Sequence, residues 1–243
     1  MPRSFRILCR PAFSSILFLP LILSPLLAIS QTDAGAIVTF TVDFPDSEPE
    51  HYSIRVQSDG AGRYQSSSRL SAGSGETDAH ETDSRGADTR DDNSFDLAFV
   101  VAANTRQRIF DLAAKAGHFQ KELDSHHKGI AFTGKKTLAY KDATRSGESS
   151  YNYSSNAAVQ ELTSLMQGLE STLEFGRRLQ YDLRYQKLAL DEELRRMEEM
   201  SHSHQLIEVA AIQPVLDRII ADPSVINVSR ARAQRLLQTG GVP

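Results

Sequence analysis

Cysteine is nearly absent from this sequence, and Cys9 is the only one among 243 residues. The chain therefore forms no internal disulfide. No Gly-x-Ser-x-Gly segment occurs, which excludes the nucleophile elbow of the α/β-hydrolases. Acidic residues outnumber basic ones, 31 to 27, and a surface with this balance disfavours contact with a phosphate backbone. We expect no nucleic acid partner.

Acidic residues are missing from residues 1–30, which have the order of a secretory signal peptide. Three arginines come first, and an apolar run follows from Ile16 to Ile29. This run is shorter than the ~20 residues that span a bilayer as a helix. Small residues at Ala28 and Ser30 predict cleavage after position 30, and a similar pair ending at Ala36 is a second candidate. We expect a secreted or periplasmic chain that has lost Cys9 and has no stable membrane span.

Alternation of apolar and polar residues predicts strands early in the mature chain. The pattern covers residues 36–43, with the period of a half-buried strand. It recurs over 51–57 and ends at a Ser-Asp-Gly turn, so residues 63–65 are expected to return as a partner strand. Residues 66–93 are rich in Ser, Gly and Asp with almost no apolar side chain, and we expect a disordered insertion there.

A helix and a second hairpin are expected to complete this region. A strand pattern over 94–101 leads into a helical pattern with Asn104 as its N-cap and Gly117 beyond its end. The second hairpin is expected over 136–154. Its facing residues are predicted to be Leu138 and Tyr140 on one strand and Tyr151 and Tyr153 on the other. Residues 31–155 therefore predict a small antiparallel sheet with one packed helix.

Proline is missing from the stretch between Ala157 and Met200, where apolar residues recur at helical spacing. We expect a long amphipathic helix over 156–200, with a kink near Gly176. Residues 201–243 then predict a helical hairpin. Pro214 is expected to kink its first helix, and Asp222 to cap its second. The predicted fold class is α+β: the small sheet and its helix, then the long helix and the C-terminal hairpin.

The closest match to a named motif is GIAFTGKKT, residues 129–137. It has the glycines and the lysine of a phosphate-binding loop, but Lys136 stands where that motif has Ser or Thr. A strand pattern follows it, so the helix N-terminus that would hold the phosphates is missing. The histidines near positions 126 and 202 lie in predicted loops, which preorganise a metal site poorly. The sequence therefore predicts no catalytic, cofactor-binding or metal-binding residue.

Aromatic and basic side chains recur in the middle of the long helical pattern. Tyr181 and Tyr185 are four residues apart, beside several arginines. Such residues either form a binding platform or pack along the flank of a helix. The candidate partner-binding residues are Phe175, Arg178, Tyr181 and Tyr185. Through this helix we expect either a protein partner or self-association.

Three stretches carry a resemblance to known sequences: FDLAFVVAANTRQRIFDLA, VQELTSLMQGLESTLEFGRRL and YQKLALDEELRRMEEM. With them, the mature chain resembles a group of exported bacterial proteins of unknown function. The resemblance implies export and no activity. About thirty C-terminal residues, around Asp222, also resemble the second helix of a HEAT hairpin, although no second copy of such a repeat is found.

These patterns favour a non-catalytic exported protein that serves in interaction or in envelope structure. The alternative is an extracytoplasmic hydrolase or carbohydrate-active enzyme whose site is assembled from residues distant in sequence. Two observations distinguish them. A deep pocket with converging ionisable groups would favour the enzyme, and an exposed apolar stripe between Phe175 and Leu190 would favour a partner surface.

Overall fold

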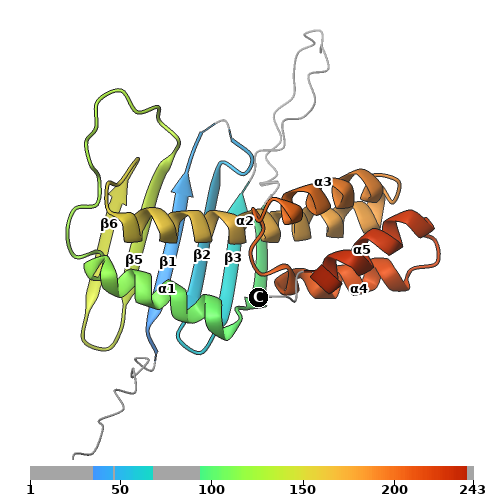
Figure 1. The fold of residues 1–243 in the computed structure, drawn as a ribbon, viewed down its shortest axis with the longest axis horizontal. Helices are drawn as coiled ribbons and strands as arrows, with labels where there is room; N and C mark the ends of the chain where they lie inside the picture. The colour runs from blue at the N-terminus through green and yellow to red at the C-terminus, as the bar shows by residue number, and fades with distance from the viewer. Residues whose placement is uncertain (1–34, 46, 68–93, 240–243) are drawn as a thin grey trace, which may run out of the picture. The chain divides into compact units, whose positions relative to one another are not determined.

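The computed structural model describes residues 35–45, 47–67 and 94–239. It shows a six-stranded antiparallel sheet with helices α1 and α2 in front of it (Figure 1). The predicted signal peptide over 1–30 lies outside the described residues, as do positions 68–93 of the predicted insertion. The predicted α+β class is confirmed.

The strands follow one another in space in the order β4-β3-β2-β1-β5-β6. Their bounds are β1 (Ile37–Asp43), β2 (His51–Gln57), β3 (Ala61–Ser67), β4 (Ser94–Val100), β5 (Lys135–Lys141) and β6 (Ser146–Tyr151). The helices are α1 (Ala103–Lys115), α2 (Ala157–Tyr185), α3 (Leu190–His202), α4 (Gln213–Ala221) and α5 (Asn227–Thr239). There are also two 3-10 turns in the described residues: η1 (Gly117–Phe119) follows α1, and η2 (Val209–Ile212) precedes α4.

One face of the sheet forms the core. Phe40 of β1 lies between Ile54 of β2 and Leu138 of β5, and Tyr64 of β3 follows Ile54. All four side chains are fully buried, as the alternation in the sequence predicts. Strand β3 continues to Ser67, so the first two residues of the predicted insertion belong to the sheet.

The second hairpin has a different register from the predicted one. Leu138 faces Ser149, Tyr140 faces Gly147, and Tyr153 lies beyond the end of β6. The turn between the two strands is closed by the Asp142 N–H, which donates to the Arg145 carbonyl at 2.9 Å. A tight turn at this point fixes which residues oppose each other along both strands.

Helix α1 begins at Ala103, so Asn104 is not its N-cap as predicted. The N-cap is Ala102, which has no capping side chain of its own. Its N–H instead donates to the Glu208 carboxylate at 3.1 Å, a partner supplied from more than a hundred residues away. The apolar face of α1 is buried, and its buried residues are Ile109, Leu112 and Ala113.

Helix α2 is 29 residues long and runs through Gly176 without interruption, so the kink predicted there is wrong. Gly176 serves close packing instead, because a Cβ at this position would lie 2.6 Å from Cγ2 of Ile212. The interruption comes after Tyr185, and α3 begins at Leu190. The predicted long helix is therefore two helices.

The last helices pack together, with α5 against both α3 and α4. Pro214 lies in the first turn of α4, where its missing N–H costs nothing, so it begins a helix and does not kink one. Asp222 does not cap α5, which begins at Asn227. Its carboxylate accepts from Ser224 and pairs with Lys187 Nζ at 2.7 Å, which joins the loop after α4 to the loop after α2.

Candidate functional site

The four predicted partner residues all lie on α2, but they have two different environments. Phe175 is buried, and the Arg178 guanidinium lies 4.6 Å from the centre of its ring. Arg178 also forms an ion pair with Glu193 of α3. Phe175 and Arg178 thus contribute to the contact between α2 and α3.

Tyr181 and Tyr185 are at the surface. Their side chains are 52% and 61% exposed, and their ring centres are 5.0 Å apart. Leu188, just past the end of α2, is 83% exposed. These three residues are the exposed large apolar side chains of the segment from Phe175 to Leu190. Exposed aromatic rings held this close together on a helix form a preformed contact surface.

A hollow of about 330 Å³ lies beside the two tyrosines, and we call it the Arg–Tyr hollow. Its lining comes from α2, the start of β4 and α4: Ser94, Phe95, Arg177, Gln180, Tyr181, Arg184, Tyr185 and Arg218. Three of these side chains are arginines and none is a carboxylate. The lining therefore favours a ligand with negative charge.

The three arginines differ in their partners. Arg177 pairs with Glu174 at 2.5 Å and with Glu48 at 3.4 Å, so its charge is neutralised within the protein. Arg184 lies over the Tyr185 ring, 5.2 Å from its centre. Within the described part of the chain, neither Arg184 nor Arg218 has a carboxylate partner. These two guanidinium groups remain available to an anion.

Arg177 connects the hollow to a buried polar cluster between α2 and the sheet. The Tyr64 hydroxyl donates to Oε2 of Glu174 at 3.1 Å, and Arg177 Nε donates to Oε1 at 2.6 Å. Glu170 lies one turn earlier on α2. Burial, together with the Glu174 charge, raises the pKa of Glu170 to about 7. Burial likewise raises the pKa of Tyr64.

Sequence reasoning missed this cluster, because charged residues on an amphipathic helix usually lie on its solvated face. A signal was present. Glu170 lies four residues after the buried Met166, and Glu174 lies four residues after Glu170, which places both carboxylates on the side of α2 that carries Met166.

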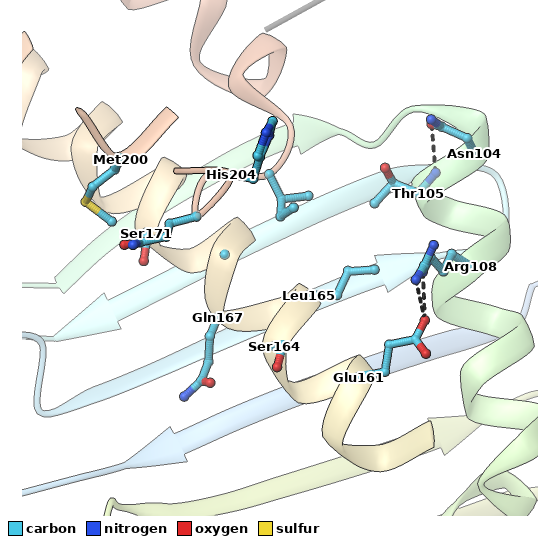
Figure 2. Close-up of a pocket in the computed structure, with 13 residues that line it drawn as sticks. Asn104, Thr105, Arg108, Glu161, Ser164, Leu165, Gln167, Ser171, Met200 and His204 are labelled. Carbon is cyan, nitrogen blue, oxygen red and sulfur yellow. Dashed lines mark hydrogen bonds and ion pairs between the residues drawn. The ribbon is translucent and has the colours of Figure 1, made fainter. Parts of the chain in front are cut away.

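A second and larger hollow, of about 710 Å³, lies between α1 and α2, and we call it the α1–α2 groove (Figure 2). Residues just before and after His204 close one end of it. The lining residues are Asn104, Thr105, Arg108, Glu161, Ser164, Leu165, Gln167, Gly168, Ser171, Met200, His204, Gln205 and Ile207. Arg108 and Glu161 form an ion pair across the groove, with Nε and Oε1 2.8 Å apart (Figure 2).

The end wall of this groove is held in place from both sides. The Ile207 N–H donates to the Gly168 carbonyl at 3.3 Å, and Glu208 accepts the Ala102 N–H of α1. Gly168 permits this approach, since a Cβ there would lie 2.7 Å from Cγ1 of Ile207. His204 and Glu208 both have positive φ, 56° and 59°, a conformation that costs energy outside glycine.

The segment that matches a phosphate-binding loop has a structural role. Lys136 is buried, and its Nζ donates to the Thr133 carbonyl at 3.1 Å and to the Asn152 carbonyl at 3.2 Å. Burial lowers the pKa of Lys136. The ammonium holds the loop before β5 to the chain after β6, and it does not point toward an open phosphate site.

The histidines singled out in the sequence do not converge. His126 Nε2 lies 2.7 Å from Oε1 of Glu122, and this contact raises the pKa of His126. His204 lines the α1–α2 groove. No group of three or more His, Cys, Asp and Glu side chains in the described ranges is placed to hold a metal ion.

Comparison with known proteins identifies no relative: no family model matches the chain, and no curated protein matches it either. Across the described residues, none of the helices is both long enough and apolar enough to cross a membrane. Conclusions about function therefore depend on the geometry of the two hollows.

Proposed function

We propose that the protein is an exported, non-catalytic interaction protein that binds an acidic segment of a protein partner at the Arg–Tyr hollow. The observation that carries the proposal is the pair of exposed rings, Tyr181 and Tyr185, beside two arginines that have no carboxylate partner among the described residues. Tyrosine and arginine, together with tryptophan, are the side chains enriched at the energetic centres of protein interfaces.

Charge supports an acidic partner. Arg184 and Arg218 come from different helices, α2 and α4, and line the same hollow, whose described lining residues include no carboxylate. A carboxylate placed there would form charge-assisted hydrogen bonds without displacing an existing partner. Arg184 is also positioned by its stacking on Tyr185, so less side-chain entropy is lost when it binds.

The enzyme alternative lacks a comparable observation. The ionisable side chains of the α1–α2 groove are Arg108, Glu161 and His204, and the first two are paired with each other. Most glycosidases use two carboxyl groups that flank the glycosidic bond, and the described lining residues supply one, Glu161. Export is proposed on the basic start and short apolar run of residues 1–30.

A binding titration tests the proposal. The probe is a fluorescent peptide that alternates glutamate and leucine, and the readout is anisotropy with the purified protein. We expect saturable binding that weakens as salt is added, because the contact is partly electrostatic. Arg218→Ala and Tyr185→Ala should each weaken binding about tenfold.

Arg55→Ala is the matched control, since Arg55 is exposed on β2 and takes no part in the hollow. Its affinity should equal that of the unchanged protein. The proposal would be contradicted if a peptide with lysine in place of glutamate bound with the same affinity. It would also be contradicted if Arg218→Ala left the affinity for the glutamate peptide unchanged.

A further inference from the structure

We propose that the α1–α2 groove is a second binding site, which takes an uncharged oligosaccharide. The groove is distinct from the Arg–Tyr hollow, and no lining residue is shared between them. Its volume, about 710 Å³, falls within the range of ~300–1,000 Å³ typical of small-molecule sites.

Two polar helix faces oppose each other across the groove. On α2, Glu161, Ser164, Gly168 and Ser171 recur at intervals of three and four residues, which places them on one face. Figure 2 shows Glu161 and Leu165 of α2 turned toward α1, with Glu161 beside Arg108. On α1, the facing residues are Asn104, Thr105 and Arg108.

Three hydrogen-bonding side chains of the groove are unused. The side chains of Ser164, Gln167 and Gln205 have no hydrogen-bond partner within the described ranges. Hydroxyl and amide side chains both donate and accept, as sugar hydroxyls do. A chain of sugar rings can therefore satisfy these groups in either direction.

The charge of the groove favours a neutral ligand. Arg108 and Glu161 neutralise each other at 2.7 Å, and the remaining lining side chains are uncharged apart from the titratable His204. An anion would meet Glu161 beside the arginine, and a cation would meet Arg108 beside the carboxylate. Either ion would therefore be repelled as well as attracted, whereas an anion in the Arg–Tyr hollow meets arginines.

Apolar surface lies among these polar groups. Leu165, Met200 and Ile207 line the groove and are only partly buried. Sugar rings present C–H faces as well as hydroxyls, and these faces can cover the exposed apolar atoms. A lining that combines separate apolar side chains with hydroxyls and amides suits such an amphipathic ring.

The end wall is held in place by contacts within the protein. Its two left-handed residues, His204 and Glu208, are held by the bonds that Ile207 and Glu208 make to α2 and α1. Strained backbone of this kind persists where the surrounding structure imposes it, often at binding sites. A preformed wall reduces the ordering cost of binding.

A peptide fits this groove less well. Its long sides are helices, so an extended peptide finds no strand edge to which it could add a strand. An amphipathic helix would need a continuous apolar floor, and here polar side chains separate Leu165 from Met200.

The test is isothermal titration calorimetry, in which the purified protein is titrated with neutral tetrasaccharides of glucose, mannose or N-acetylglucosamine. At least one should bind in the millimolar range or tighter. Gln167→Ala removes an unused amide and should weaken binding about tenfold, the value of one good hydrogen bond. Ser164→Leu fills the groove and should abolish binding.

Gln57→Ala is the control, because Gln57 is also an exposed glutamine but lies at the end of β2, outside the groove. Circular dichroism and the urea midpoint of each variant confirm folding. Absence of binding by all three sugars overturns the proposal, and so does binding that Ser164→Leu leaves intact. Tighter binding of a tetra-uronate or of a neutral peptide at the same residues would show that the ligand is not an uncharged oligosaccharide.

Discussion

The Tyr64 hydroxyl donates to the Glu174 carboxylate at 3.1 Å and joins residues 110 positions apart in the chain. The donor lies on β3, next to the edge strand β4, and the acceptor on α2 is almost completely buried. A buried carboxylate is tolerated only where its oxygens have partners, and here Arg177 provides the second. This contact fixes α2 on the sheet just before the segment that carries Tyr181 and Tyr185.

Tyr64→Phe is expected to lower the free energy of unfolding by about 2 kcal/mol, because one oxygen of a buried carboxylate loses its donor. Equilibrium urea unfolding measures this. Tyr181→Phe is the matched control, since this tyrosine is exposed, and it should leave the midpoint unchanged. An equal effect of both substitutions would show that the buried hydrogen bond contributes nothing.

Stability should also depend on pH through Glu170. Its pKa is about 7 in the folded protein, above the ordinary value of 4.5. The unfolded chain therefore releases this proton at lower pH than the folded protein does. The contribution of Glu170 to stability is present below pH ~4.5 and is lost as pH rises toward ~7.

Glu170→Gln removes this titration, so the variant should gain stability relative to the unchanged protein between about pH 5 and about pH 8, on the order of 2 kcal/mol. The measurement is the difference in unfolding free energy between the two proteins at each pH. A constant difference for Glu170→Gln across the range would contradict the assignment.

Gly168→Ala is expected to destabilise the protein by about 1–3 kcal/mol, because the new Cβ would lie 2.7 Å from Cγ1 of Ile207. Thermal unfolding measures the loss. The double variant Gly168→Ala/Ile207→Ala removes the colliding atoms and should lose less than the two single substitutions together. Strictly additive losses would mean that the close approach is not the cause.

Export gives a prediction about the native N-terminus. Protein isolated from its host should begin near Gln31 or, with the second cleavage site, shortly after Ala36. Intact-mass spectrometry measures this directly. A soluble cytosolic species that begins at Met1 or Pro2 would refute export.

The strands around Phe40 and Ile54 were predictable because each buries one face. In the sequence, these apolar residues alternate with polar neighbours. Helix α2 was predictable for the same reason at helical spacing. The end of α2 was not predictable. Helix propensity alone suggests a break at Gly176, whereas the structure explains this glycine by its close packing against Ile212.

The candidate sites were predictable only in part. Tyr181 and Tyr185 were evident from the sequence, but the arginine that completes the hollow, Arg218, comes from α4 and has no local signal. The α1–α2 groove depends on residues from three separate segments and on two left-handed residues, which sequence periodicity does not encode.

Photo-crosslinking in the intact host tests the central claim most directly. Benzoylphenylalanine replaces Tyr185 in one strain and Tyr153, an exposed tyrosine after β6, in another. The account predicts a crosslinked partner at Tyr185 only, identified by mass spectrometry as a protein joined through an acidic segment, and lost when Arg218→Ala is added. Identical products at both positions, or a second copy of this chain at Tyr185, would contradict it.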